Sequence, residues 1–204
     1  MHDTESSHFT KVIFCGDSTV GKSTMIQRIV EGEARHVQNS TMGAAFYSSK
    51  HLYKDTQINI NFWDTAGQEE YRSLVNIYFR SVDIVIVVFD LSKPKTFESV
   101  EDWIDEATEN AGQSEPNFII VGNKEDLECK VSIEKINNIK AKYKYVQTSA
   151  INGDDVNTLI NMILETALER EKYKDEMLKN EKEVDLEVVK NDKPKQNKID
   201  KPCC

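Results

Sequence analysis

The glycine- and lysine-containing loop at residues 16–23 constrains the fold of this chain more than any other feature. It reads G-D-S-T-V-G-K-S and matches the phosphate-loop pattern G-x-x-x-x-G-K-[S/T]. An apolar run at residues 12–15 comes before it, and apolar residues at helical spacing follow it from Met25 to Val30. The sequence therefore predicts a strand, a phosphate-binding turn and a helix, in that order.

The rest of the chain repeats this alternation of strands and helices. Four stretches have the alternating or continuously apolar pattern of strands: residues 46–53, 57–64, 84–89 and 118–121. Three have apolar residues at helical spacing: residues 97–107, 133–139 and 156–164. We therefore expect an α/β fold of the P-loop NTPase type, with a mostly parallel sheet and helices on both faces. Ligands of such sheets bind at the carboxyl ends of the strands, where the motifs below lie.

The phosphate loop carries the first group of candidate binding residues. Glycines let its backbone close around phosphate oxygens, so that N–H groups and a helix N-terminus face the negative charge. Lys22 would reach the β- and γ-phosphates, and the Ser23 hydroxyl would bind Mg²⁺. The alternative is an ordinary strand–turn–helix with a lysine in its first turn. The candidates are Gly16, Asp17, Ser18, Thr19, Val20, Gly21, Lys22, Ser23 and Thr24.

A second motif, D-x-x-G followed by glutamine, stands at residues 64–68, at the end of a predicted strand. Asp64 would hold a magnesium-bound water, and the Gly67 amide would contact the γ-phosphate. Gln68 would orient the attacking water. Thr41 lies in a polar stretch and would be a second protein ligand of magnesium when the γ-phosphate is present; the alternative is a surface threonine. The catalytic candidates are Lys22, Thr41, Gly67 and Gln68.

A third motif, N-K-E-D at residues 123–126, selects the base. The Asp126 carboxylate can accept hydrogen bonds from the ring N–H and the exocyclic amine of guanine, whereas adenine offers an acceptor and a carbon there. A backbone N–H of the T-S-A stretch at residues 148–150 would donate to the guanine carbonyl. The base-binding candidates are Asn123, Lys124, Asp126, Ser149 and Ala150. Together the motifs predict a magnesium-dependent site for GTP and GDP.

The composition indicates in which compartment this protein works and which kinds of partner it excludes. The 204 residues carry a net charge of −9, which argues against a nucleic-acid binder. No apolar run approaches the roughly 18 residues needed to cross a bilayer, and the N-terminus lacks a signal-peptide core. We therefore expect a cytosolic protein in which Cys15 and Cys129 are reduced. Residues 190–204 differ from the acidic body, with five Lys, two Asp and a terminal cysteine pair.

On these motifs the chain resembles a Rab-type small GTPase of the Ras superfamily. The resemblance covers about residues 9–170 and the last two residues. Four further stretches support the resemblance: W-D-T-A-G-Q-E at 63–69, Y-R-S-L at 71–74, Y-F-R at 78–80 and C-C at 203–204. It implies a six-stranded G domain at residues 9–172, a flexible N-terminus at 1–8 and a hypervariable tail at 173–204. Residues 40–46, S-T-M-G-A-A-F, look more like the early-endosomal Rab branch than like secretory Rabs.

The resemblance also implies functions outside the nucleotide motifs. Phe46, Trp63 and Tyr78 would form an exposed aromatic triad that presents the nucleotide state to effectors; the alternative is three ordinary half-buried aromatics. Cys203 and Cys204 would carry two geranylgeranyl groups and, with the tail lysines, attach the protein to the cytosolic face of an intracellular membrane, endosomal by this resemblance. The implied partners are an exchange factor, a GTPase-activating protein, effectors, a GDP-dissociation inhibitor and a prenylation escort.

Four residues depart from the family pattern. Ala34 stands where an aromatic residue usually lies against the guanine, which predicts faster nucleotide release. Thr19 replaces a small residue and predicts a tightened or strained phosphate loop. Ile151 and Glu70 replace a common Lys and a common Arg. None of these changes removes a catalytic group, so we expect GTP hydrolysis to survive.

Hydrolysis is expected to be slow without help. No arginine is obviously placed to act on the γ-phosphate, so we expect a rate on the order of 10⁻⁴ to 10⁻³ s⁻¹, that of a Ras GTPase without its activator. Three alternatives stay open. A Ras- or Rho-like signalling switch is disfavoured by the terminal cysteine pair, a non-hydrolysing scaffold by Gln68, and an ATP-using P-loop kinase by Asp126.

Overall fold

The computed structural model describes residues 9–33, 43–67, 72–113 and 115–191 and divides into two compact units. The first unit, Met1–Leu168, is built on a six-stranded sheet with the strand order β2-β3-β1-β4-β5-β6. The strands are β1 (Phe9–Cys15), β2 (Ala44–Tyr53), β3 (Thr56–Thr65), β4 (Ile84–Asp90), β5 (Asn117–Asn123) and β6 (Lys144–Thr148). The helices are α1 (Lys22–Glu31), α2 (Arg72–Phe79), α3 (Pro94–Glu98), α4 (Val100–Asn110), α5 (Ile133–Lys142) and α6 (Val156–Asn191).

The sheet is mostly parallel, which confirms the predicted fold class. Strand β1 pairs in parallel with β3 and β4, and β4, β5 and β6 continue the parallel order. Only β2 among these strands is antiparallel, to β3. The two are joined by a tight hairpin in which Lys54 and Asp55 have φ values of 48° and 61°, as a two-residue turn with left-handed central positions requires.

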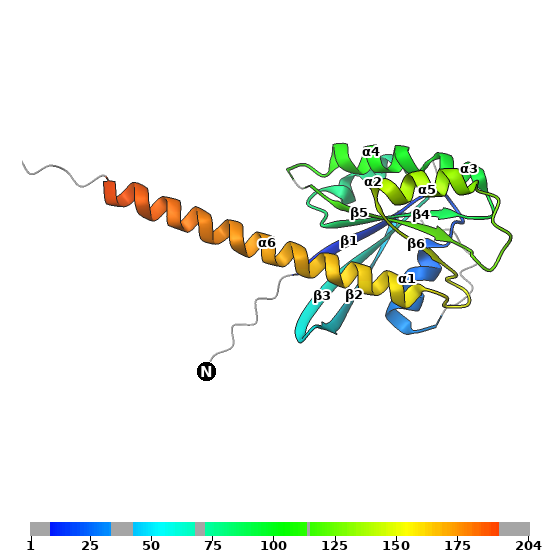
Figure 1. Ribbon diagram of the computed structural model, residues 1–204, viewed down its shortest axis with the longest axis horizontal. Helices are drawn as coiled ribbons and strands as arrows, with labels where there is room; N and C mark the ends of the chain where they lie inside the picture. The colour runs from blue at the N-terminus through cyan, green and yellow to red at the C-terminus, as the bar shows by residue number, and fades with distance from the viewer. Residues whose placement is uncertain (1–8, 34–42, 68–71, 114, 192–204) are drawn as a thin grey trace, which may run out of the picture. The chain divides into compact units, whose positions relative to one another are not determined.

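Two apolar layers cover the two faces of the sheet, because successive side chains of a strand point to opposite faces. Val12 and Phe14 of β1 belong to a cluster with Met25 of α1 and Leu159 of α6. Ile13, between them, belongs to the cluster that α2, α4 and α5 build on the other face. Figure 1 shows this division of the helices between the two faces.

The parallel strands bring several polar residues together where they end. Asp64 near the end of β3 lies opposite Phe14 in β1. Asp90, the last residue of β4, lies opposite Asn123, which ends β5 and pairs in turn with Thr148 of β6. This edge of the sheet therefore gathers the segments that carry the predicted motifs, as expected for a parallel α/β sheet.

The helices differ from the prediction in two places in this unit. The apolar spacing over residues 97–107 predicts one helix, but α3 and α4 are separate and meet at Ser99. Pro94 starts α3, where its missing N–H costs no hydrogen bond. Helix α2 was not predicted, although Val75 and Phe79 stand four residues apart and are both buried.

The second unit, Glu169–Cys204, contains the rest of α6. The apolar spacing predicts a helix over residues 156–164, but α6 continues to Asn191. The many Lys and Glu residues after Leu168 explain this, because they favour helix without needing burial. The remainder of the predicted tail, residues 192–204, lies outside the described residues. Over the ranges that the structure does describe, no helix is both long enough and apolar enough to cross a membrane.

Candidate functional site

The phosphate loop joins the end of β1 to the first turn of α1, as predicted. At Gly16 the backbone lies so close to β4 that a Cβ atom would stand 2.1 Å from the Val88 carbonyl oxygen. Gly21 has a φ of 103°, and its Cβ would stand 2.3 Å from Asn123 Nδ2. Both positions therefore require glycine. Thr19 has a φ of 66°, a conformation that costs roughly 1–3 kcal/mol without glycine, so the strain predicted for this loop is present.

Lys22 begins α1 and points back into its own loop. Its Nζ donates hydrogen bonds to the carbonyl oxygens of Gly16 and Asp17, both at 2.8 Å, and the residue is only 5% exposed. Burial lowers the pKa of its ammonium group to about 8, although the nearby Asp64 and Asp17 carboxylates favour the charged form. The charge is thus held by two carbonyl dipoles of the phosphate loop.

The proposed metal ligands of the described residues lie next to this loop. Ser23 Oγ donates to Asp64 Oδ2 at 2.6 Å, which joins α1 to the end of β3. A hydroxyl and a carboxylate are hard oxygen donors of the kind that Mg²⁺ prefers, so the donor set fits the ion. At Gly67 a Cβ atom would stand 2.4 Å from Lys22 Nζ and 2.5 Å from the Asp17 carbonyl. The D-x-x-G segment therefore lies directly against the phosphate loop.

The Asp17 side chain fastens the phosphate loop to α4. Its Oδ2 accepts a hydrogen bond from Ser99 Oγ, and its Oδ1 accepts one from Trp103 Nε1, both at 3.0 Å. The two donors fix the orientation of the carboxylate and offset part of its negative charge. The Asp17 carbonyl oxygen accepts from Lys22.

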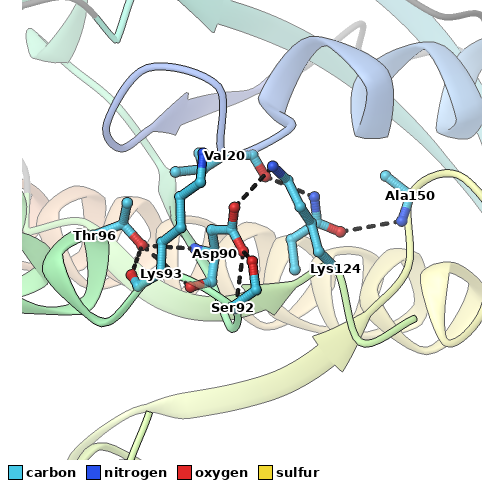
Figure 2. A network of polar contacts seen from close by, with 8 residues as sticks. Val20, Asp90, Ser92, Lys93, Thr96, Lys124 and Ala150 are labelled. Carbon is cyan, nitrogen blue, oxygen red and sulfur yellow. Dashed lines mark hydrogen bonds and ion pairs between the residues drawn. The ribbon is translucent and has the colours of Figure 1, made fainter. Parts of the chain in front are cut away.

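Asn123 ties the phosphate loop to the loop that follows β6. Its Nδ2 donates to the Val20 carbonyl oxygen at 2.7 Å. Its Oδ1 accepts from the Thr148 hydroxyl at 3.2 Å and from the Ala150 N–H at 3.1 Å. The residue is 1% exposed, so these bonds replace the water that it loses on burial. Figure 2 shows the bonds that end at Val20 and Ala150. Asn123 thus acts as a link between two loops.

We call residues 149–153 the guanine loop, because the predicted base contacts come from it. Ser149 is fully buried and its Oγ donates to Asp126 Oδ1 at 2.5 Å. Its carbonyl accepts from the Gly153 N–H at 2.7 Å, which closes the loop. Asp126 itself is exposed, with its carboxylate oriented by Ser149. The Ala150 N–H is paired with Asn123, so a guanine carbonyl would share or replace that bond.

Asp90 and Lys124 form an ion pair between the ends of β4 and β5. Lys124 Nζ lies 2.8 Å from Asp90 Oδ2, and the backbone N–H and hydroxyl of Ser92 donate to Asp90 Oδ1. Burial alone would raise the pKa of the Asp90 carboxyl, but the hydrogen bonds from Lys124 and Ser92 outweigh it and hold the pKa below its usual value. Figure 2 shows the carboxylate between these partners. The pair fixes the start of the N-K-E-D segment.

The three aromatic residues named from the resemblance do meet on one surface. The Phe46 and Trp63 ring centroids are 5.2 Å apart, and those of Trp63 and Tyr78 are 5.1 Å apart. Phe46 is 53% exposed, as predicted, but Trp63 and Tyr78 are half-buried because they pack against the core. Lys11 Nζ lies 5.6 Å from the centre of the Trp63 ring, within the range of a cation–π contact. The rings form a contiguous aromatic surface on β2, β3 and α2.

Several predicted residues lie outside the described part of the chain. They are Ala34, Thr41, Gln68, Glu70, Cys203 and Cys204. The roles assigned to them stay predictions. The structure does bring the described candidates together: the phosphate loop, Asp64 and Gly67 at one end, and Asn123, Asp126 and the guanine loop at the other.

Sequence reasoning missed three residues that shape this site. Asp90 could have been suspected, because a polar residue ends a strand that is otherwise apolar. Trp103 lies in the apolar pattern of α4, and only its Nε1 hydrogen bond reveals its contact with the phosphate loop. Arg28 gave no signal, because a charged residue on a helix is ordinarily a solvated one. In the structure its guanidinium reaches the guanine loop.

Two comparisons with known proteins bear on this site. Residues 11–169 match the model of a family described as the Ras family. Over 161 residues the chain is 35% identical to a Caenorhabditis elegans protein named Ras-related protein rab-39, and the alignment covers 75% of this chain and 70% of that protein. The family match reaches from β1 into α6 and so includes every strand end that contributes to the site.

Proposed function

This chain belongs to the Ras family and is a Rab-type small GTPase, and we propose that it works as a membrane-attached GTP switch in endocytic vesicle traffic. GTP hydrolysis, GTP and GDP binding, a general requirement for Mg²⁺ and control by regulators are properties of the family. We propose here which residues perform these steps, how the protein attaches to a membrane and which trafficking route it serves.

One observation carries the nucleotide site. Asn123 bonds to Val20 of the phosphate loop and to Ala150 of the guanine loop, so a single buried side chain sets the distance between the two ends of the ligand. Ser149 orients the Asp126 carboxylate beside them. This arrangement supports a ligand with phosphates at one end and guanine at the other, with Asp126 accepting from its ring N–H and amine.

The phosphate end supplies charge and contact. Lys22 would exchange the carbonyl oxygens of Gly16 and Asp17 for β- and γ-phosphate oxygens. Ser23 would hold Mg²⁺ directly and Asp64 through water, and Mg²⁺ when bound would offset negative charge on the phosphates. The Gly67 amide would donate to the γ-phosphate. Thr41 and Gln68 are proposed as the second magnesium ligand and the residue that orients water.

The switch follows from the contacts of Gly67. Its backbone lies against Lys22 and Asp17, and it stands two residues after the end of β3, the strand that carries Trp63. Loss of the γ-phosphate on hydrolysis would release the Gly67 amide and change the segment after it. The aromatic surface of Phe46, Trp63 and Tyr78 would then report the nucleotide to effectors. An activating protein would supply the missing cation for hydrolysis, and an exchange factor would remove GDP.

Membrane attachment rests on the sequence of the tail. Two geranylgeranyl groups at Cys203 and Cys204 would anchor the protein stably, since one lipid chain gives only marginal binding. The lysines of residues 190–204 would add attraction to an anionic leaflet. Mass spectrometry of the protein from its native cell is expected to show two isoprenyl additions; an unmodified terminus would contradict this part of the proposal.

The most direct test of the proposed site identifies the natural ligand. Freshly purified protein is denatured, and the released nucleotide is identified by ion-exchange chromatography. We expect GDP or GTP at close to one nucleotide per chain, because the site holds phosphates and guanine together. An adenine nucleotide, or no nucleotide from a folded and monodisperse preparation, would contradict the proposal. Asp126→Ala should give protein with little guanine nucleotide bound.

A further inference from the structure

Arg28 contacts the guanine loop although it belongs to α1. Its Nε donates to the Ala150 carbonyl oxygen at 2.7 Å, and its Nη2 donates to the Ile151 carbonyl oxygen. The guanidinium is planar, so two of its N–H groups hold two consecutive carbonyls in a fixed relation. The side chain is half-buried.

The guanine loop is shaped to receive this side chain. A Cβ atom at Gly153 would stand 2.9 Å from Arg28 Nη1 and 3.3 Å from Arg28 Cζ. The missing side chain at Gly153 therefore leaves the space that the guanidinium occupies. The bond from the Gly153 N–H to the Ser149 carbonyl closes the loop around it. Ala150, Ile151 and Gly153 of the loop thus all lie against the Arg28 side chain.

The position of Arg28 on α1 connects the two ends of the site. The same helix begins with Lys22 and Ser23, the residues of the phosphate end. Met25 and Ile26, between them and Arg28, are fully buried and fix the helix against the sheet. Arg28 therefore holds the two carbonyls in place relative to a helix that is itself fixed against the sheet.

We propose that Arg28 is a positioning residue that sets how long guanine nucleotide stays bound, by holding the guanine loop in the form that binds the base. The inference rests on the proposed guanine site. Asn123 holds Ala150 by its N–H, and Arg28 holds the same residue by its carbonyl. Without the arginine, the bonds that the described residues give the loop are those within itself and to Asn123, Asp126, Asp154 and Val156. The guanine base would then bind to a loop that is held less firmly, and the nucleotide would leave sooner.

The departure at Ile151 fits this assignment. Arg28 bonds the backbone of residue 151, so the contact does not depend on the side chain there. The Ile151 side chain is 49% exposed and carries no charge. The chain therefore keeps the backbone geometry of the guanine loop while lacking the lysine that the family usually has after Ser-Ala.

The test compares release of a fluorescent GDP analogue from wild type, Arg28→Ala, Arg28→Lys and the control Arg80→Ala, whose exposed arginine lies at the end of α2. Arg28→Ala should release the analogue at least about tenfold faster, equivalent to about 1.4 kcal/mol. Arg28→Lys keeps one charged donor and should fall in between, which also preserves the test if the alanine variant folds poorly. Arg80→Ala should match wild type.

Two further measurements separate positioning from general damage. Arg28 acts at the base end, so its fold effect on release should persist when EDTA removes magnesium from the phosphate end. Single-turnover hydrolysis of prebound GTP should change less than about twofold, because the hydrolytic groups are elsewhere. Release within twofold of wild type, or an acceleration that disappears with EDTA, would overturn the inference. Wild-type protein that binds no GDP would overturn the proposed function, and this inference with it.

Discussion

The phosphate end and the guanine end of the site are built differently. At the phosphate end, Lys22 bonds to carbonyls of its own loop and Ser23 bonds to Asp64, and a nucleotide with its magnesium would exchange these contacts for new ones. At the guanine end, Arg28 holds the loop by the carbonyl oxygens of Ala150 and Ile151, which a base has no need to release. Asn123 holds it by the Ala150 N–H, the one bond that a guanine carbonyl would share or replace. One end is made to rearrange and the other to stay in place.

On the proposed function, this difference would let one ligand be held firmly while its third phosphate is sensed. The fixed end would contribute affinity that is common to GTP and GDP. The exchangeable end contains the groups that are proposed to contact the γ-phosphate, and Gly67 follows β3, the strand of the aromatic surface. Substitutions at the two ends should therefore affect different measurements, and a residue that joins them should affect both.

Gly21→Ala should have the largest effect, because it damages both ends at once. The new Cβ would stand 2.3 Å from Asn123 Nδ2, in a backbone conformation that alanine disfavours. Strain of roughly 1–3 kcal/mol and the loss of a buried hydrogen bond predict a hundredfold to thousandfold weaker GDP affinity. Isothermal calorimetry measures the affinity, and circular dichroism without nucleotide checks folding. A folded variant with GDP affinity within threefold of wild type would contradict the linked-ends description.

Asn123→Ala should come next, since it unlinks the ends without straining the phosphate loop. It removes three hydrogen bonds and leaves the Val20 carbonyl buried without its partner. A net loss of about 2–3 kcal/mol predicts roughly thirty- to hundredfold faster GDP release. Stopped-flow release of a fluorescent analogue measures it, with the exposed Asn137→Ala on α5 as the matched control. Equal GDP release rates for the two variants would show that Asn123 does not link the two ends.

The phosphate end should also respond to pH in a way that the guanine end does not. The pKa of Lys22 is lowered to about 8 by burial, and bound phosphates would raise it again, so binding above pH 8 takes up a proton. GDP affinity should therefore fall as pH rises through 8, by up to about tenfold per pH unit. The stability of nucleotide-free protein should move the other way between pH 8 and 10.5, because the unfolded lysine holds its proton there.

Calorimetry of GDP binding at pH 7, 8 and 9 checks this dependence. Lys22→Arg provides the comparison, because a guanidinium does not titrate in this range while any titration of the base is shared by both proteins. The arginine variant should bind more weakly but with a flatter pH profile. Identical profiles for the two proteins would show that Lys22 is not the titrating group.

Trp103→Phe should have the smallest effect. A smaller aromatic ring stays in the core, and the Nε1–H bond to Asp17 is lost. Because Ser99 still holds the other carboxylate oxygen, we expect a loss of about 1 kcal/mol, or a few-fold in GDP affinity. The preference for guanine over adenine nucleotides should not change. A changed base preference, measured by competition binding, would contradict the claim that the two ends act separately.

The sequence predicts the positions of the site better than its construction. The motifs place the phosphate loop, Asp64, Gly67, Asn123 and Asp126 correctly at strand ends, because such loops need particular residues at fixed spacing. The orientation of Asp17 and the reach of Arg28 could not be predicted, since each depends on a partner more than 80 residues away. Side-chain partners across a parallel sheet leave no local pattern.

The fold shows the same limit. Buried strands were predicted from continuous apolar runs, and the antiparallel pairing of β2 with β3 fits two alternating stretches joined by a short turn. The break between α3 and α4 at Ser99 was missed, because apolar spacing continues across it. Apolar spacing predicts only the first part of α6, because the rest of this helix depends on helix propensity.

The central claim is that a fixed guanine end and an exchangeable phosphate end form one site selective for guanine. Titration calorimetry of nucleotide-free protein with GTP and with ATP, both with Mg²⁺, tests it most directly. We predict that GTP binds on the order of 10⁴-fold more tightly, because ATP would leave the Asp126 carboxylate without its two donors. Equal affinities for GTP and ATP would contradict the account.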